Sequence, residues 1–482
     1  MSVLNKLQPE GVFAIFEQLC AIPHGSRNTK AISDFCVKFA EQRGLRCIQD
    51  ENNNVILFAP ASAGMEHAQP VILQGHLDMV CEKTPDCDLD MEKQGLRLQT
   101  DGEWVWADQT TLGGDDGIAV AYALAILDDA SIQHPPLEVI LTVDEEIGML
   151  GAASIDLGQI GGRRLLNIDS EEEGVLLTSC AGGATVSCSI PMMWSIKKGL
   201  RVTVKIHGLR GGHSGTEIDK GRANANVLLG RFLNELDKEY PYALCTVDGG
   251  LKDNAIPRES TADLIISPDY LEELCAYAAK TQSAWREEFG ENDPEIAVSV
   301  QEIGIDSHEV MFGDCRRNTL AVMSQLPNGV QAMSQEIEGL VQTSLNFGIL
   351  KTDFRGVHMT FSVRSSINAE KDALMEQLAD LMARYGGGAE VDGEYPAWEY
   401  RKESKLRRIM TQVYTEQYGE APKIQAIHAG LECGLLAGKL PDLDAISFGP
   451  DIEEIHTTRE RLSIPSVQRT WNFILGVLKA CK

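Results

Sequence analysis

Polar residues that could do chemistry follow four apolar runs of the sequence. The run in ILQGHLDMV ends in a histidine and an aspartate, VIL is followed by TVDEE, LLNI by an aspartate, and AISFG by a loop that reaches a second histidine. The residues at these places are His76, Asp78, Glu145, Glu146, Asp169 and His456. A further aspartate, Asp115, lies in TTLGGDDGIAV just before another apolar run. Imidazoles and carboxylates bind metal ions and transfer protons, so these positions are candidates for a catalytic site.

Each candidate also has an ordinary structural explanation. Asp115 or Asp116 can cap a helix, because aspartate is among the preferred N-cap residues. The pair in TVDEE fits an exposed acidic turn, and a single histidine at a strand end is more often hydrogen-bonded than metal-bound. Asp169 begins the run DSEEE, which is typical of a solvated surface. The coincidence of these groups at several strand ends nevertheless favours a shared site.

Two imidazoles and three carboxylates suit a metal that accepts nitrogen and oxygen ligands, such as zinc, with manganese or cobalt as alternatives. If one carboxylate bridges, five side chains suffice for two metals. A metal pair lowers the pKa of a bound water and polarises a carbonyl group. Of Glu145 and Glu146, one can then bind metal while its neighbour acts as general base. Asp78 is expected to orient the imidazole of His76.

The elements that must hold these residues resemble those of a parallel sheet. The apolar runs VILF (55–58), VIL (71–73), VIL (139–141) and LLNI (165–168) predict strands buried on both faces. Residues 117–127 are apolar all round and predict a buried helix, and further helices are expected at 10–21 and 29–43. Ligands of open α/β sheets gather at the carboxyl ends of the strands, where the candidates fall.

The pattern changes near residue 195 and returns near residue 396. RVTVKIH (201–207) and VHMTFSVR (357–364) alternate apolar and polar residues, as in strands with one solvent-facing side. Helical patterns lie near 222–239, 270–288, 369–385 and 403–418, and DAISFG (444–449) predicts another buried strand. We therefore predict an α/β fold. Its mainly parallel-sheet catalytic domain comprises residues 1–190 and 396–482 and is interrupted by an α+β domain at 191–395.

The composition argues against several other classes of protein. The 43 basic and 71 acidic residues give a net charge of −28, which would repel nucleic acids and anionic membranes. No apolar run approaches the roughly 18 residues that span a membrane, and the start MSVLNKLQPEGVFAIF lacks the pattern of an export signal. The 12 cysteines include no CxxC pair, so we expect reduced thiols in a cytoplasmic protein.

A set of motifs, taken in order, resembles a known family. The motifs are GHLDMV, TTLGGDDG, TVDEEIG, NIDSEEEG, GLRGGHSG, DNAIPRE, HAGLECG and GP…IHTTRE. Essentially end to end, the chain resembles the co-catalytic di-zinc peptidases of the aminoacylase and carboxypeptidase G clan. Within the clan it is most similar to the carnosinase-like aminoacyl-histidine (Xaa-His) dipeptidases, also called peptidase D. It departs from that subgroup at Gly114-Asp115-Asp116, where Ala-Asp-Asn is more usual, and at HTTRE, which replaces His-Ser-Pro-Asp-Glu.

This resemblance implies a metal-dependent dipeptidase with two Zn²⁺ per subunit, Mn²⁺ or Co²⁺ being alternatives. The implied ligands are His76 and Asp169 for one metal, Glu146 and His456 for the other, and Asp115 as the bridge between them. A metal-bound hydroxide would attack the peptide carbonyl, Glu145 would act as general base, and Asp78 would support His76. The implied substrates are dipeptides, especially Xaa-His dipeptides including β-alanyl-histidine.

The resemblance also implies that the middle domain is a lid that carries the contacts of a homodimer. His213 would reach the active site of the partner subunit and stabilise the oxyanion. Asn254 and Arg364 would bind the terminal carboxylate of the substrate, and Glu432 would form part of the pocket wall. Without the resemblance, His213 is typical of a glycine-rich surface loop and Arg364 of a solvated strand end.

Other interpretations of the sequence stay open. An N-acyl amino acid deacylase or an aminopeptidase for longer peptides would share the metal centre and differ in the lid pocket. A catalytically inert binding module would lack a ligand or the base, whereas all of these positions are filled here. The glycine-rich turns CAGGA and RGGHSG lack the Lys-Ser/Thr ending of a phosphate-binding loop.

Overall fold

The computed structural model describes residues 3–482, which divide into two compact units with separate hydrophobic cores. Unit 1 contains the described residues up to Ser179, together with Tyr400–Ala426 and Leu431–Lys482. Unit 2 contains Cys180–Glu399 and Ile427–Gly430. The boundaries that we expected at 190/191 and 395/396 fall at the ends of two strands of unit 2. Residues 182–191 and 388–395 pair with each other there, so both strands belong to that unit.

Unit 1 is built on an eight-stranded mixed sheet. Its strands, in order across the sheet, are β1 (Arg46–Gln49), β2 (Val55–Ala59), β6 (Leu137–Thr142), β3 (Val71–His76), β7 (Arg164–Asn167), β21 (Asp444–Ser447), β8 (Val175–Cys180) and β20 (Lys423–Ile427). The central strands β6, β3, β7 and β21 are parallel. The run 55–58, however, forms β2, which pairs antiparallel with both β1 and β6. Its apolar character reflects burial between neighbours and does not depend on strand direction.

Helices cover both faces of the sheet of unit 1. They are α1 (Glu10–Cys20), α2 (Lys30–Gln42), α3 (Gly114–Asp128), α4 (Leu150–Ser154), α9 (Lys405–Tyr418), α10 (Glu432–Lys439) and α11 (Ile464–Ala480). Alternate residues of a strand point to opposite faces. Val71 and Leu73 of β3 accordingly join the core formed with α1, α3 and α11, whereas Gln74 contacts Glu432 of α10. A four-stranded sheet of β4 (Leu98–Thr100), β5 (Trp104–Ala107), β22 (Ile452–Glu453) and β23 (Arg461–Ser463) completes the unit.

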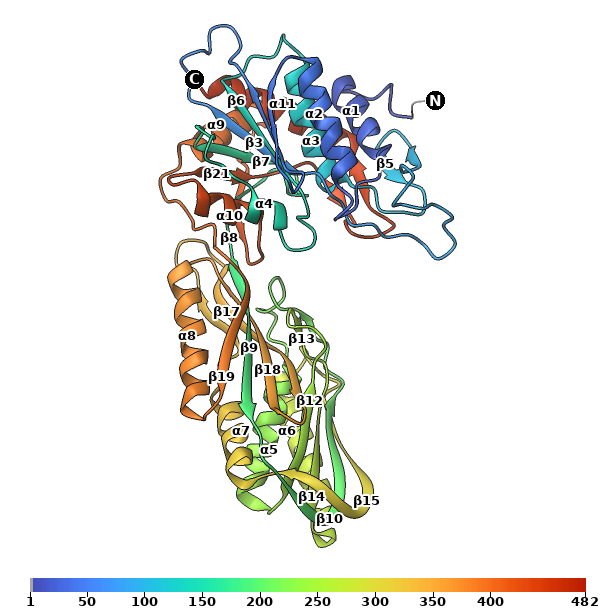
Figure 1. Ribbon diagram of the computed structural model, residues 1–482, viewed down its shortest axis with the longest axis vertical. Helices are drawn as coiled ribbons and strands as arrows, with labels where there is room; N and C mark the ends of the chain where they lie inside the picture. Colours follow the sequence, from blue (N-terminus) through green and yellow to red (C-terminus); the bar gives the residue numbers. More distant parts are fainter. Residues whose placement is uncertain (1–2) are drawn as a thin grey trace. The chain divides into compact units, whose positions relative to one another are not determined.

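The central helix α3 is the buried helix expected at 117–127. Its residues from Gly114 to Ile126 are all buried, and it lies beside α1 (Figure 1). Tyr122 stacks on Trp471 of α11, and its hydroxyl donates a hydrogen bond to the carbonyl oxygen of Val467. A helix that is apolar all round is stable only when protein surrounds it. The first turn of α3, which carries Asp115, is therefore fixed against the core.

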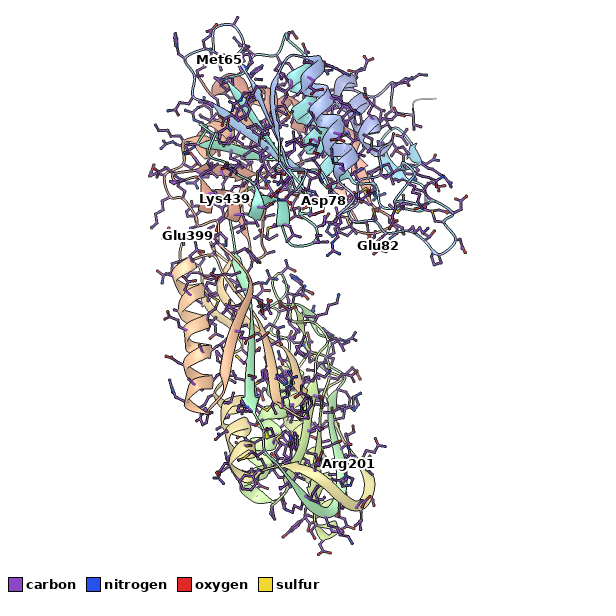
Figure 2. All side chains as sticks on the ribbon, in the orientation of Figure 1. Met65, Asp78, Glu82, Arg201, Glu399 and Lys439 are labelled. Carbon is purple, nitrogen blue, oxygen red and sulfur yellow. The ribbon has the colours of Figure 1, made fainter. Side chains whose placement is uncertain are left out.

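A second helix contact ties α10 to α4 on the opposite face. Lys439 of α10 is labelled in Figure 2. Its Nζ donates hydrogen bonds to the carbonyl oxygens of Ala152, Ala153 and Ile155, at 2.7, 2.7 and 2.8 Å. The last carbonyl groups of a helix have no partners within the helix, and a cationic side chain satisfies them. The segment from the end of β6 to the end of α4 is thus held at its C-terminal end.

Unit 2 is built on a nine-stranded sheet whose pairs are antiparallel. Its strands, in order, are β15 (Ala297–Met311), β10 (Trp194–His207), β14 (Ser260–Ile266), β12 (Ala243–Gly249), β17 (Val341–Thr352), β18 (Gly356–Ser365), β9 (Gly182–Pro191) and β19 (Gly388–Tyr395), with β16 (Gly329–Met333) beside β17. The two-residue strands β11 (Gly212–His213) and β13 (Ala255–Ile256) form a small separate pair.

Helices cover this sheet as the alternating strand pattern predicts. They are α5 (Ala225–Glu239), α6 (Leu271–Phe289), α7 (Gly313–Gln325) and α8 (Asn368–Arg384), and a short 3-10 helix spans Pro268–Tyr270. Figure 1 shows α8 running along β9 and β19. The mixed α/β architecture that we predicted is confirmed. Across residues 3–482, no helix has the length and apolar character needed to cross a membrane.

Candidate metal centre

Four parallel strands deliver the candidate side chains to one edge of the sheet of unit 1. His76 is the last residue of β3, and Asp78 follows it. Glu145 and Glu146 come after β6, and Asp169 comes after β7. The loop after β21 leads to His456. The carboxyl ends of parallel strands meet at one edge, so the order of the strands brings these residues together.

Asp115 lies between the two imidazoles. One of its carboxylate oxygens, Oδ1, is 3.1 Å from Nε2 of His76, and the other, Oδ2, is 3.1 Å from Nε2 of His456. Nε2 of His456 is also 3.0 Å from Oε1 of Glu146, and Nε2 of His76 is 3.7 Å from Oδ1 of Asp169. A single carboxylate thus joins two imidazole–carboxylate pairs. This is the arrangement that a bridging ligand needs.

The same residues form overlapping clusters in which potential ligand atoms lie within 4.8 Å of one another. One cluster is Asp115, Glu146 and His456, and another is His76, Glu145 and Glu146. Glu145 lies within this reach of His76 but has no close contact with His456 comparable to that of Glu146. All of the predicted ligands are therefore brought together, with Glu145 beside them.

Asp78 contacts His76 in a different way from the one we expected. Nδ1 of His76 is 2.9 Å from the backbone oxygen of Asp78 and 3.7 Å from its carboxylate Oδ1. The carboxylate instead accepts hydrogen bonds from the backbone N–H groups of Glu145, at 3.0 Å, and Glu146, at 3.4 Å, and from the hydroxyl of Ser26. Asp78 therefore orients the imidazole through its carbonyl group and the Glu145–Glu146 turn through its side chain.

Burial and the charges of neighbouring groups shift the pKa values of the side chains at this edge of the sheet. Burial, with the charges of Asp115 and Glu146, raises the pKa of Asp169 to about 7. Burial, with the charge of Asp169, also raises the pKa of Glu145 well above its usual value. Hydrogen bonds to Asp115 and Glu146 raise the pKa of His456 to about 10. These shifts all oppose negative charge or favour positive charge, as in a site that needs a cation.

The pKa values of His76 and Asp115 show the same coupling between imidazole and carboxylate. Burial would lower the pKa of His76, but the hydrogen bond to Asp115 and the charge of Asp169 raise it well above its usual value. Burial would raise the pKa of Asp115, but the hydrogen bonds to His456 and His76 hold it below its usual value. Carboxylate and imidazole each favour the charged form of the other.

The residues present fit a pair of divalent cations. Nδ1 of His76 faces a carbonyl oxygen and so carries the hydrogen, which leaves Nε2 to bind a cation. Nε2 of His456 faces the carboxylates of Asp115 and Glu146, which supply oxygen ligands. Imidazole nitrogen and carboxylate oxygen are ligands that zinc accepts. A bound cation would also offset the repulsion among the buried carboxylates.

Sequence reasoning missed some groups at this edge. Asp116, for which the sequence offered a helix-capping role, accepts a hydrogen bond from the backbone N–H of His76 at 3.1 Å. Glu171 lies in the run that we took as solvated, yet it forms a cluster with Asp115 and Asp169, and burial raises its pKa to about 8. The run Asp169–Glu173 follows a strand that ends at the site, and that position was the signal that could have identified Glu171.

Glu432 is buried within unit 1. Its Oε2 accepts hydrogen bonds of 2.6 Å from both Gln74 of β3 and Thr142 of β6, and burial raises its pKa to about 7. The side chain has no exposed surface. It therefore supports the strands that end at the site. Its place in the pocket wall, which the resemblance implied, stays a prediction.

The residues predicted to bind substrate lie in unit 2. Nδ1 of His213 accepts hydrogen bonds from the backbone N–H groups of Gly215 and Thr216, while burial and the charge of Arg364 lower the pKa of the ring. Nη1 of Arg364 donates to the hydroxyl of Tyr395, and its buried Nε has no hydrogen-bond partner among residues 3–482. Asn254 is exposed. Arg364 thus has hydrogen-bonding capacity left for a ligand.

The fold and the site define a metal-dependent hydrolase of the α/β class, and comparisons with known proteins agree. Residues 72–480 match the model of peptidase family M20/M25/M40. The cytosol non-specific dipeptidase of Escherichia coli (strain K12) is 36% identical over 481 residues, which cover 99% of both chains. The crystal structure of aminoacylhistidine dipeptidase from Vibrio alginolyticus matches with a TM-score of 0.94 and 36% identity, covering 99% of this chain and 98% of that one. Aminopeptidase PepT from Bacillus cereus, at 15% identity and a TM-score of 0.56, covers 98% of this chain and 99% of its own, and shares the fold.

The chain belongs to peptidase family M20/M25/M40. It is therefore a peptidase of a metal-dependent family, and the resemblance inferred from its motifs is confirmed.

Proposed function

We propose that the protein hydrolyses dipeptides, and that Xaa-His dipeptides, including β-alanyl-histidine, are among its substrates. The observation that carries the proposal is the position of Asp115 between two imidazoles, with Glu145 beside the same cluster. The relatives add the substrate class: the E. coli protein is called a non-specific dipeptidase and the V. alginolyticus protein an aminoacylhistidine dipeptidase. An enzyme that hydrolyses many different dipeptides, including those with histidine at the second position, would fit both names.

The proposed cofactor is a pair of zinc ions per subunit, for which manganese or cobalt could substitute. His76 and Asp169 would hold one ion, Glu146 and His456 the other, and Asp115 would bind both. When bound, such a pair lowers the pKa of a coordinated water and polarises the peptide carbonyl. The carbonyl group of Asp78 would keep His76 in the tautomer that presents Nε2 to the metal.

Glu145 is the proposed general base. Its carboxylate takes a proton from the attacking water and then donates it to the nitrogen of the leaving amine. Burial raises the pKa of this carboxyl group, which brings its proton affinity closer to what transfer near neutral pH requires. The carboxylate of Asp78, bound to the N–H groups of Glu145 and Glu146, fixes the turn from which the base projects.

Unit 2 supplies the proposed substrate contacts and acts as a lid and dimerisation domain of a homodimer. Arg364 would bind the terminal carboxylate of the dipeptide, since its Nε is buried without a partner among the described residues and a guanidinium matches a carboxylate in shape. Asn254 would assist it. His213 would donate to the oxyanion, acting in the site of the partner subunit. The name of the E. coli relative assigns that protein to the cytosol, and we propose the same compartment here.

A substrate panel tests this function. We expect the zinc-loaded protein to hydrolyse β-alanyl-histidine and several α-dipeptides, with at least tenfold lower kcat/KM for a tripeptide and for an N-acetyl amino acid. Chelation of zinc should abolish all of these activities, which separates them from any contaminating metal-independent peptidase. A preference for the N-acetyl amino acid would favour the deacylase alternative, and a preference for the tripeptide would favour the longer-peptide aminopeptidase.

A further inference from the structure

Glu460 is a buried carboxylate that the proposed mechanism does not use. It belongs to HTTRE, is 3% exposed and accepts hydrogen bonds from three consecutive backbone N–H groups. Its Oε1 is 2.8 Å from the nitrogen of Gly114, and its Oε2 is 2.9 and 3.3 Å from the nitrogens of Leu112 and Gly113. Asp115 is the next residue along the chain. The carboxylate therefore holds the backbone from which the proposed bridging ligand projects.

The turn at 112–114 is shaped to accept this carboxylate. Gly113 has a φ of 68°, in the left-handed region that favours glycine. A Cβ atom on Gly114 would lie 3.3 Å from Oε1 of Glu460, and one on Gly113 would lie 2.8 Å from the sulfur of Met79. Glycine at position 114 therefore lets the carboxylate approach the backbone closely, and glycine at position 113 lets the turn pack against Met79.

The segment that carries Glu460 also carries His456. The backbone N–H of Thr457 donates to the carbonyl oxygen of Glu454, and that of Glu460 donates to the carbonyl oxygen of Thr457, so the segment is a compact turn. His456 of this turn contacts the Asp115 carboxylate at 3.1 Å, while Glu460 holds the preceding backbone. The two turns are thus joined at two points.

We propose that Glu460 is a positioning residue that fixes Asp115 relative to His456, so that both can bind the same metal ion. The inference rests on the proposed metal centre. A carboxylate offers two acceptor oxygens to three converging N–H groups, whereas a glutamine offers one oxygen and turns an NH₂ group towards donors. Groups that orient metal ligands typically contribute about 10–100-fold to metal affinity or activity.

Glu138 provides a matched control in the same unit. It is 7% exposed, and its two carboxylate oxygens accept the backbone N–H groups of Gly161 and Gly162 at 2.9 and 2.8 Å. Glu138 lies near the amino end of β6, whereas the candidate metal ligands lie beyond the carboxyl ends of the strands. Its replacement removes a similar hydrogen-bonded carboxylate without touching the metal centre.

The test compares zinc affinity, by chelator competition, in the full-length wild type, Glu460→Gln and Glu138→Gln. We expect Glu460→Gln to weaken zinc binding about 10–100-fold and to lower kcat at limiting zinc, with KM unchanged and kcat recovered at high zinc. Glu138→Gln should bind zinc as the wild type does, and the melting temperatures of the two metal-free variants should fall by similar amounts. Gly114→Ala, which crowds the same carboxylate, should weaken zinc binding less but in the same direction, and it decides the question if Glu460→Gln does not fold.

Wild-type zinc affinity in Glu460→Gln, or equal losses of affinity in both glutamine variants, would overturn the inference while leaving the proposed function intact. A wild type that neither binds zinc nor cleaves dipeptides would overturn the proposed function, and this inference with it.

Discussion

The polar residues of unit 1 and unit 2 differ in what surrounds them. In unit 1 the proposed metal ligands contact one another, as in the pair of 3.1 Å contacts that Asp115 makes with the two imidazoles. In unit 2 the proposed substrate residues do not form such a cluster: Asn254 is exposed and Arg364 keeps a nitrogen without a partner within residues 3–482. The proposed metal ligands are already assembled, whereas Arg364 keeps hydrogen-bonding capacity for a ligand. Substitutions in the two units should therefore affect different steps.

The largest expected effect comes from the proposed base of unit 1. Glu145→Gln should lower kcat about 10²–10⁴-fold, the usual contribution of general acid–base catalysis, while zinc affinity stays near that of the wild type. Glu146→Gln is the matched variant, since the neighbouring residue contacts His456 and should lose zinc affinity as well. Kinetics and zinc titration of both variants check this. Equal zinc affinities in the two variants would remove the distinction between base and ligand.

Removal of the metal should have the next largest effect, and it should destabilise unit 1 without changing unit 2. A ligand that binds only the folded state raises the ratio of folded to unfolded molecules roughly 100-fold when its concentration is 100 times its Kd. Chelation should therefore accelerate amide hydrogen exchange in β3, β6 and β7 by about this factor, because these strands lead to the ligands. Exchange in β10 and β14 of unit 2 should stay the same. Equal acceleration in both units would contradict a metal centre confined to unit 1.

Arg364→Leu should act on binding. We expect KM for a dipeptide to rise about 10–100-fold, because a charge-assisted contact with the substrate carboxylate is lost, with a smaller change in kcat. Arg355→Leu removes an exposed arginine of the same unit and should leave KM unchanged. A dipeptide amide, which has no terminal carboxylate, should not distinguish Arg364→Leu from the wild type. If it does distinguish them, the arginine has another role.

The smallest expected effect concerns two residues of HAGLECG that lie in different units. Burial lowers the pKa of His428 to about 4, from 6.5, and raises that of Glu432 to about 7, from 4.5. Between pH 6.5 and 4 the unfolded chain binds a proton that folded unit 2 excludes, so this contribution to stability is lost as the pH falls. Between pH 4.5 and 7 folded unit 1 keeps a proton that the unfolded chain releases, so the Glu432 contribution is lost as the pH rises.

Amide exchange across this pH range, with chelator present, would measure the two opposite slopes of stability against pH, each at most about 1.4 kcal/mol per pH unit. His428→Gln should flatten the slope of unit 2 alone and Glu432→Gln that of unit 1 alone. Unchanged slopes in both variants would show that other groups dominate the titration.

The sequence predicted most of the architecture because strand burial and helix periodicity are local signals. The strands predicted at 71–73 and 139–141 and the all-apolar helix at 117–127 lie within β3, β6 and α3, and the run 165–168 overlaps β7 up to Asn167. Strand direction is not a local signal, and so the run 55–58 was wrongly grouped with parallel strands although β2 is antiparallel to its neighbours.

The candidate site could be predicted to the extent that its residues follow strand ends. His76 and Asp169 were found in this way. The contact between Glu460 and the turn at 112–114 joins segments more than 340 residues apart and leaves no periodic pattern in either. Pairings of this kind depend on the packing of the whole unit.

In the proposed metal centre, Asp115 binds two metal ions, one on the His76 side and one on the His456 side. Anomalous diffraction at the zinc absorption edge from crystals of the zinc-loaded protein tests it most directly. We expect two anomalous peaks per subunit, one beside Nε2 of His76 and one beside Nε2 of His456, with the carboxylate of Asp115 between them. A single peak, or peaks away from Asp115, would contradict it.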